Sequence, residues 1–257
     1  NVGYLVEKRE ELKAIFSLCK KLDLLVSVHC EDDATIQKVE AEYTGDYNPP
    51  AHALLRPSEA EARGIDTVGR VALELDMPLY VVHLSSKAGL QKVRELRAKG
   101  LRVIVETTPH YLFLNKSKLE GPDGALYVMT PPLRGVEDNE ALQGAVLNGE
   151  IQIIATDHCS FTVQQKMASD DCRTILPGIP GTEELLSLVY SFAANSGRIG
   201  VQQVVNLLST AVAKAFGLYP RKGAIRVGSD ADLVLFDPDY AWTISKETTH
   251  SESKYTP

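Results

Sequence analysis

Apolar residues recur along most of the chain in two alternating patterns, one helical and one extended. Residues 5–22 place apolar side chains along one helical stripe, and the short run LLVSVH (24–29) then reads as a strand that is apolar on both faces. The same pairing returns three times, which predicts parallel βα units. The expected helices are 58–75, 86–99 with Ser85 as its cap, 136–149, 181–196 and 201–216, and the expected strands are 24–29, 78–83, 101–108 and 151–157.

Two segments depart from this alternation. Residues 41–57 are rich in Gly, Asn and Pro, which predicts a loop with His52 in solvent. After residue 220, short β-type runs are separated by Gly-Ser-Asp and Asp-Pro turns, which predicts the antiparallel strands of a small separate module. The pattern therefore divides the chain into an α/β part at 1–219 and a β-rich part with a polar tail at 220–257.

Four βα units are compatible with two architectures. They complete an open, doubly wound sheet, but they make only half of a (β/α)₈ barrel. A half barrel leaves open edges of apolar strand, which natural proteins avoid. Either the fold is an open sheet, or the chain is the C-terminal part of something longer.

Composition and charge exclude several classes of protein. The chain has 257 residues, of which 44% are hydrophobic and 24% are charged, as in an ordinary globular protein. A net charge of −7 without a basic cluster argues against nucleic acids and anionic membranes as partners. We find no apolar run near the roughly 18 residues that span a bilayer, and no signal-peptide pattern. Four cysteines without a CxxC pair indicate reduced thiols in a cytoplasmic protein.

Polar side chains follow three of the four expected strands. His29, His83 and Asp157 end runs that are otherwise apolar. The carboxyl ends of parallel strands form the active-site face of an α/β barrel, so we expect these side chains to meet there. Two neutral imidazoles and a carboxylate suit Zn²⁺ or a similar ion, with positions left for water. If the strand stays extended, alternation directs His158 away from the face of Asp157.

Each of these residues also has a purely structural explanation. A histidine after a strand is often only hydrogen-bonded, and Asp157 is suited to cap the next turn. Three polar ends on one sheet favour the metal interpretation over three independent coincidences. Among the other polar residues, Glu106 is expected either to orient a ligand or simply to be paired, and His110 either to shape the site or to pack a loop.

Eight motifs in order carry a family resemblance: VHCED, YVVHLSS, ETTPHYLFL, MTPPLR, IATDHCSF, PGIPGTEELL, KGAIRVGSDADLVLFDP and TISKETTH. Together they resemble the hydantoinase/dihydropyrimidinase branch of the amidohydrolase superfamily, over essentially the whole chain. The resemblance implies the C-terminal half of a TIM (β/α)₈ metallo-hydrolase barrel, strands five to eight, followed by part of a small β-sandwich.

The resemblance also implies roles for individual residues. His29 and His83 match the two later histidine ligands of a binuclear zinc site, and Asp157 matches the catalytic aspartate after the eighth strand, itself a metal ligand. Thr130 stands where the family places a Ser or Thr that contacts the substrate ring. Pro177 stands where the family usually has Asn in a substrate-holding turn, and proline removes an N–H donor there.

Part of the family's metal shell has no counterpart in these 257 residues. The chain has no His-x-His and no lysine at the end of an expected strand. We therefore expect the first-strand His-x-His and the carboxylated bridging lysine upstream of residue 1.

The implied reaction is the metal-dependent opening of a small cyclic amide, a hydantoin or dihydropyrimidine ring, by a homo-oligomeric enzyme. Allantoinase and dihydroorotase are alternatives, because ETTPHYL resembles those relatives equally well. The other alternative is a non-catalytic assembly protein like the collapsin-response-mediator proteins, which keep the fold without the metal ligands.

Overall fold

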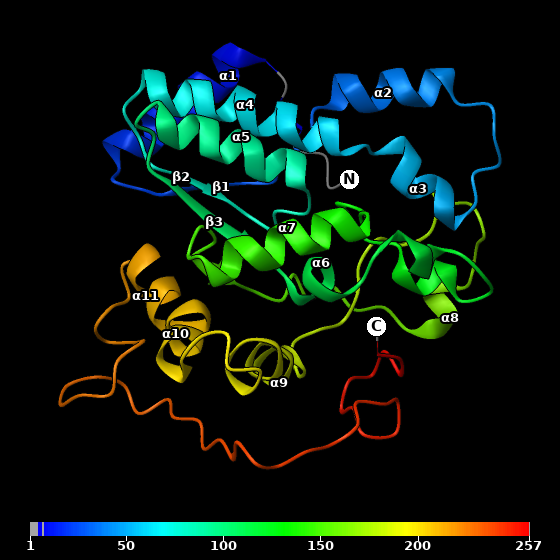
Figure 1. Cartoon of the computed structure of the whole chain (residues 1–257). Coiled ribbons are helices and arrows are strands. Elements are labelled where there is room, and N and C mark those ends of the chain that lie inside the picture. The colour runs from blue at the N-terminus through cyan, green and yellow to red at the C-terminus, as the bar shows by residue number, and fades with distance from the viewer. Residues whose placement is uncertain (1–4, 7, 257) are drawn as a thin grey trace.

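A four-stranded parallel sheet lies at the centre of the computed structural model, which describes residues 5, 6 and 8–256 (Figure 1). Its strand order is β1-β2-β3-β4, the order of the chain, so each crossover moves one strand along the sheet. Ser27 pairs with Tyr80, and Tyr80 with Ile104. The strands are β1 Val26–Val28, β2 Leu79–Val81, β3 Val103–Thr107 and β4 Ile153–Ile154. The four predicted parallel βα units are confirmed.

Helices cover both sides of this sheet. In Figure 1, α1, α4 and α5 lie together above the strands, and α9, α10 and α11 lie below them. The longer helices are α1 Arg9–Lys21, α2 Asp33–Glu42, α3 Pro49–Leu55, α4 Ser58–Glu74, α5 Lys87–Ala98 and α7 Val136–Leu147. The shorter ones are α6 Pro109–Phe113, α8 Val163–Lys166, α9 Leu185–Val189, α10 Val201–Val205 and α11 Ala211–Ala215, with π-helical turns at Tyr190–Asn195 and Asn206–Thr210. None of the helices in the described residues is long and apolar enough to cross a membrane.

The packing of α4 against α5 forms a large part of the core. Ile65, Leu90 and Leu96 are fully buried there. Gly69 on α4 lies so close to Leu96 that a Cβ atom at this position would collide with the leucine side chain. The helix pair therefore depends on a small residue facing a large one, as in close-packed protein interiors.

The segment 41–57 is not the loop that its composition predicted. Asn48 caps α3 by accepting a hydrogen bond from the backbone of Ala51, and Pro49 occupies the first turn, where proline favours a helix start. His52 lies inside α3 and is only 8% exposed, so the prediction of a solvated histidine is wrong. Ser86, not Ser85, caps α5, because its side chain accepts from the backbone of Gly89.

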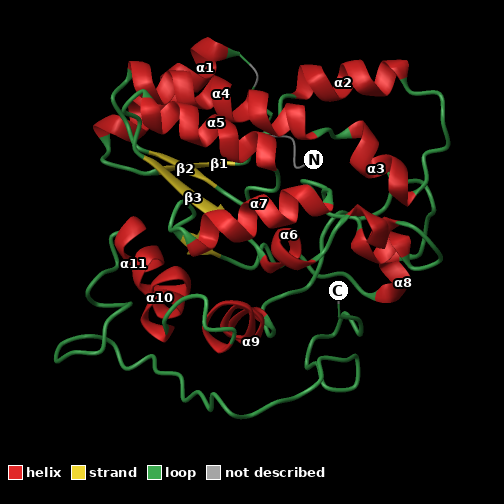
Figure 2. Cartoon of the chain, viewed as in Figure 1, coloured by secondary structure: helices red, strands yellow, loops and turns green. Residues whose placement is uncertain are grey.

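Residues 220–256 contain no strand in the structure, so the predicted antiparallel strands are wrong here. Figure 2 shows this segment as a long loop that runs below the helical layer. Val227 and Leu235 are fully exposed, and the apolar runs have no neighbouring strand to pair with among the described residues. A strand is stable only when its backbone finds a partner, so an apolar pattern alone does not form one. The division into 1–219 and 220–257 stays a prediction.

We expect Leu96→Ala to lower the free energy of unfolding by about 2–5 kcal/mol, because it empties a fully buried site between α4 and α5. Leu18→Ala is the matched control, since Leu18 lies on α1 with 57% of its surface exposed. Its effect should stay within about 0.5 kcal/mol. Denaturant unfolding measures both values, and equal losses for the two variants would contradict this account of the core.

Candidate functional site

The three predicted site residues lie where the chain leaves the carboxyl ends of the strands. His29 follows β1 directly, His83 follows β2, and Asp157 follows β4. His83 and Asp157 both have left-handed backbones, with φ of +36° and +46°. This conformation is costly for residues other than glycine, by about 1–3 kcal/mol each, and it clusters at functional sites. Two such residues at one edge of the sheet mark this edge as the candidate site.

The two histidines face each other through their ring nitrogens. Nδ1 of His29 lies 3.0 Å from Nε2 of His83, and the rings meet edge to face. Burial and the neighbouring His29 ring lower the pKa of His83 to about 3, so its imidazole is neutral. Zinc–nitrogen bonds of about 2.0–2.1 Å place two ligand nitrogens on one tetrahedral ion roughly 3.3 Å apart. The observed pair therefore fits two ligands of one metal ion.

Glu31 and Arg56 fix the orientation of the His29 ring. Nε2 of His29 lies 2.9 Å from the Glu31 carboxylate, and Arg56 donates to the same carboxylate oxygen at 2.6 Å. Burial raises the pKa of Glu31, but the bonds from His29 and Arg56 outweigh it and hold the pKa at about 2. A carboxylate on the second nitrogen is the usual partner of a metal-binding histidine, because it leaves the first nitrogen aimed at the ion.

Glu106, at the end of β3, supports the backbone of His83. Its carboxylate accepts from the His83 N–H at 3.3 Å and from the Tyr80 hydroxyl at 2.5 Å. Burial raises the pKa of Glu106, and these two donors oppose that effect. Both roles expected for Glu106 are thus present, since it is hydrogen-bonded and it holds a predicted ligand in place.

A buried carboxylate also anchors the loop after His83. Glu61 on α4 accepts from the backbone and hydroxyl of Ser85 at 2.8 and 2.7 Å, and from the hydroxyl of Ser86. Nε of Arg134 donates to the Ser85 hydroxyl at 3.0 Å. Burial raises the pKa of Glu61, whereas the positive charge of Arg134 and the serine donors lower it. This network connects α4 to the loop that carries the left-handed histidine.

Asp157 is not the third member of a ready metal cluster. Among the residues that the structure describes, no group of three or more His, Cys, Asp or Glu side chains is arranged to hold a metal ion. Burial raises the pKa of Asp157 to about 6, with Glu106 adding to the rise and His29 opposing it. The sheet brings His29 and His83 together, and Asp157 lies near enough for the charges of His29 and Glu106 to act on its carboxylate.

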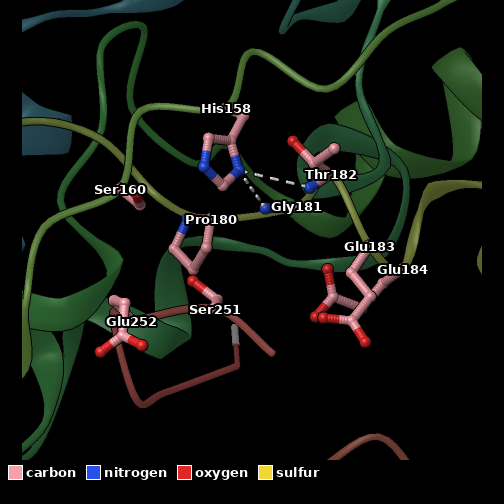
Figure 3. Close-up of a pocket in the computed structure, with 9 residues that line it drawn as sticks. All are labelled: His158, Ser160, Pro180, Gly181, Thr182, Glu183, Glu184, Ser251 and Glu252. Carbon is pink, nitrogen blue, oxygen red and sulfur yellow. Dashed lines mark hydrogen bonds between the residues drawn. The ribbon is translucent and has the colours of Figure 1, made fainter. Parts of the chain in front are cut away.

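The expectation for His158 depended on an extended strand at Asp157, and this condition is not met. Strand alternation does not apply, because β4 ends at Ile154. Nδ1 of His158 accepts from the backbone N–H groups of Gly181 and Thr182 at 3.2 and 3.3 Å (Figure 3). His158 and residues 180–184, drawn in Figure 3, are among the residues that line a cavity of about 360 Å³. His158 therefore fastens this loop.

His110, on α6, is hydrogen-bonded to the same loop. Its Nε2 lies 2.9 Å from the carbonyl of Pro180, and its ring is 97% buried. Burial lowers the pKa of His110, so the ring is neutral and donates one hydrogen bond. Of its two expected roles, the structure shows that it fastens a loop at the site edge.

The structural role of His52 was not predicted from the sequence. Its Nε2 lies 2.8 Å from the Met129 carbonyl and 3.3 Å from the Thr130 hydroxyl. Burial lowers the pKa of His52 to about 4, although the bond to Met129 raises it. The neutral ring therefore orients the segment that contains Thr130, a predicted substrate contact. Only the three-dimensional path of α3 reveals this, because His52 is 78 residues away from Thr130 along the chain.

The turn at Pro177 has a constrained neighbour. Gly178 has φ of +156°, and a Cβ atom there would collide with the carbonyl of Cys159. The Gly178 N–H donates to the Val128 carbonyl at 3.0 Å. The Pro177 turn therefore lies against the segment that leads to Thr130, so the two predicted substrate-contacting segments are neighbours.

Comparison with known proteins identifies the family of the chain. The sequence profile of the amidohydrolase family matches residues 6–255. The chain belongs to the amidohydrolase family. It is 39% identical over 241 residues to a D-hydantoinase of Ralstonia pickettii, which covers 91% of this chain and 52% of that protein. It is 41% identical over 244 residues to a D-hydantoinase of Geobacillus stearothermophilus, covering 93% and 52%.

Solved structures show the same relationship. The dihydropyrimidinase from Brevibacillus agri matches with a TM-score of 0.91 and 38% identity, covering 99% of this chain and 57% of that one. The D-hydantoinase (dihydropyrimidinase) from Thermus sp. matches with a TM-score of 0.93 and 34% identity, covering 100% and 57%. The chain thus spans about half the length of the relatives it matches. Its parallel sheet with covering helices is part of their TIM barrel, as the resemblance implied.

The buried position of His52 predicts a loss of stability in acid. Between pH 6.5, its ordinary pKa, and about 4, its folded pKa, the unfolded chain binds a proton that the folded protein excludes. The free energy of unfolding is therefore unaffected by His52 above pH 6.5. It falls by up to about 3 kcal/mol as the pH is lowered toward 4, because only the unfolded chain takes up the proton. In His52→Gln, which keeps an N–H donor but does not titrate, we expect this part of the loss to disappear.

Denaturant unfolding at several pH values tests this expectation. His250→Gln is the matched control between about pH 5 and 6.5, because the His250 side chain is 92% exposed and the pKa of its partner Glu183 lies below the ordinary value of 4.5. In this range it should keep the unmodified pH dependence. Acid destabilisation of equal size in His52→Gln and the unmodified protein would show that His52 does not contribute.

Proposed function

We propose that these residues form part of an enzyme that opens a small cyclic amide, a hydantoin or dihydropyrimidine ring, by metal-dependent hydrolysis. The observation that carries the proposal is the pair of ring nitrogens of His29 and His83, 3.0 Å apart at the carboxyl edge of the sheet. The similarity to D-hydantoinases supports the substrate class. Because the chain covers about half of those relatives, the activity belongs to the whole protein.

We assign the metal to His29 Nδ1 and His83 Nε2, with Asp157 as a further ligand once the site is complete. The ion proposed is Zn²⁺, in a binuclear site whose other ligands come from outside these 257 residues. A bound zinc ion lowers the pKa of water and polarises the amide carbonyl. The residues of this chain supply the two imidazoles and, through Glu31, the orientation of one of them.

Asp157 is the proposed proton carrier. A general base takes a proton from the attacking nucleophile and then returns it, as an acid, to the leaving ring nitrogen. The place of Asp157 after β4 supports this role, because the carboxylate lies near enough to His29 and Glu106 for their charges to act on it.

Thr130 and Pro177 are the proposed substrate contacts. The Thr130 hydroxyl lies beside His52, and the Pro177 turn lies against the segment before Thr130. Proline has no N–H, so Pro177 can offer the substrate only its carbonyl oxygen, which accepts a hydrogen bond. An acceptor fits the ring N–H of a cyclic diamide.

We also propose a cytoplasmic homo-oligomer, with a homotetramer as the expected form. The four cysteines are free thiols, as is usual in a reducing compartment. The apolar side chains of Ile225, Val227 and Leu235 are at least 90% exposed, which supports their burial against further protein. Allantoinase, dihydroorotase and a non-catalytic assembly role remain the alternative functions.

We expect His83→Ala in the full-length protein to lower the metal-to-protein ratio after dialysis to roughly half or less, because one ligand of a binuclear site is lost. Elemental analysis measures this ratio without any activity assay. His250→Ala, on an exposed side chain, should retain the unmodified ratio. If the unmodified protein holds no metal and hydrolyses no cyclic amide, the non-catalytic assembly role replaces this proposal.

We expect Asp157→Asn in the full-length protein to lower kcat by about 10²–10⁴, because the amide cannot accept the proton. Asp170→Asn is the matched control, since Asp170 is exposed in the loop after α8. The steady-state assay uses dihydrouracil, 5-phenylhydantoin, allantoin and dihydroorotate in parallel. Preference of the unmodified enzyme for allantoin or dihydroorotate would refute the substrate class, and near-normal kcat in Asp157→Asn would refute the proton carrier.

A further inference from the structure

Lys166 is a buried cation. Its polar sequence context, TVQQKMASDD, predicts an exposed side chain instead. Lys166 ends α8, and its side chain is fully buried. Its ammonium donates to three backbone carbonyls, those of Val128 at 2.6 Å, Leu176 at 2.8 Å and Gly178 at 3.0 Å. Over the described part of the chain, no carboxylate forms an ion pair with it.

A buried ammonium is costly unless its surroundings compensate the charge. Burial lowers the pKa of Lys166 to about 7, while the thiol of Cys159 opposes this effect. The compensation visible in the structure is three carbonyl dipoles, one for each N–H that an ammonium offers. Each of these bonds is assisted by charge and is therefore stronger than a bond between neutral groups.

The three carbonyls belong to two segments that are far apart in sequence. Val128 lies two residues before Thr130, and Leu176 and Gly178 flank Pro177. The Val128 carbonyl also accepts a hydrogen bond from the Gly178 N–H, so the same oxygen is bonded to Lys166 and to the Pro177 turn. The lysine therefore connects the two segments to which we assign the substrate contacts, without extending to the substrate itself.

We propose that Lys166 is a positioning residue that sets the spacing between the Thr130 segment and the Pro177 turn, and thereby the fit of the cyclic amide. This inference rests on the proposed function for its substrate. Its physical basis is that loop segments hold a ring closely only when their backbones are fixed relative to each other. His110 and His158 fasten the same loop further along, at 180–182, so Lys166 controls its beginning.

The test uses the full-length protein with Lys166→Met, which keeps the length of the side chain but has no donor, and Lys166→Gln, which keeps two donors. Lys116→Met is the matched control, because Lys116 is an exposed lysine at the start of the 3₁₀ helix Lys116–Leu119. The measurements are hydrogen exchange in peptides covering 126–132 and 171–181, metal content, and kcat and KM for 5-phenylhydantoin.

In Lys166→Met we expect exchange in both peptides to accelerate roughly tenfold or more, as the loss of charge-assisted hydrogen bonds implies. We expect KM to rise about tenfold, with kcat within about twofold and metal content unchanged, because binding is lost uniformly. Lys166→Gln should fall between Lys166→Met and the unmodified protein, and Lys116→Met should match the unmodified protein.

Unchanged exchange in both peptides would overturn the inference. So would a fall in kcat and metal content at constant KM, which indicates general support of the fold. If Lys166→Met does not fold, Lys166→Gln decides by the same criteria. If the unmodified protein hydrolyses no cyclic amide, the proposed function fails, and the exchange data alone decide whether Lys166 holds the two segments together.

Discussion

The parallel pairing of the four strands forces the segments that follow them to leave from the same edge of the sheet. β1 pairs with β2, β2 with β3 and β3 with β4, in the order of the chain. Residues that are far apart in sequence therefore become neighbours without any further device. His29 and His83 are 54 positions apart, yet their ring nitrogens approach to 3.0 Å. The chemistry proposed for this protein depends on that constraint, because a metal ion needs ligands from several segments at one point.

Backbone strain at this edge is balanced by buried carboxylates. The left-handed conformation of His83 is held by Glu106 on its N–H, and the loop after it is held by Glu61 through Ser85 and Ser86. Each carboxylate loses solvation when it is buried, and each regains it through several donors, as buried polar groups require. The cost of strain and of burial is thus concentrated where precise side-chain direction matters. In the core between α4 and α5, close apolar contacts such as that of Gly69 with Leu96 form much of the packing.

The sequence predicted the parallel sheet and the meeting of the two histidines, because strand periodicity and the geometry of parallel sheets determine both. The pattern left the strand order open between an open sheet and a half barrel, and only the family resemblance favoured the barrel. The sequence did not predict the turn at Asp157, since the sign of φ at a non-glycine residue depends on tertiary contacts. His52 and Lys166 were missed for a related reason: each is buried by elements distant in sequence, and local polarity cannot reveal that. The strands expected after residue 220 are an error of the opposite kind, because the sequence predicted elements that the described residues do not contain. Their apolar pattern is real, but a strand also needs a partner, and none lies beside them in the described residues.

Separate structural supports serve the two tasks of the site. The imidazole pair is oriented by Glu31 and Arg56, which reach it from the loop after β1 and from the end of α3. The segments assigned to the substrate are fixed by Lys166 and His52, whose hydrogen bonds include neither histidine of that pair. Sites far enough apart to share no partners respond to substitution independently. Substitution at Lys166 is therefore expected to change the proposed substrate fit without changing the proposed metal ligands, whereas His52 is coupled to the imidazole pair through the charges of Arg56 and Glu31.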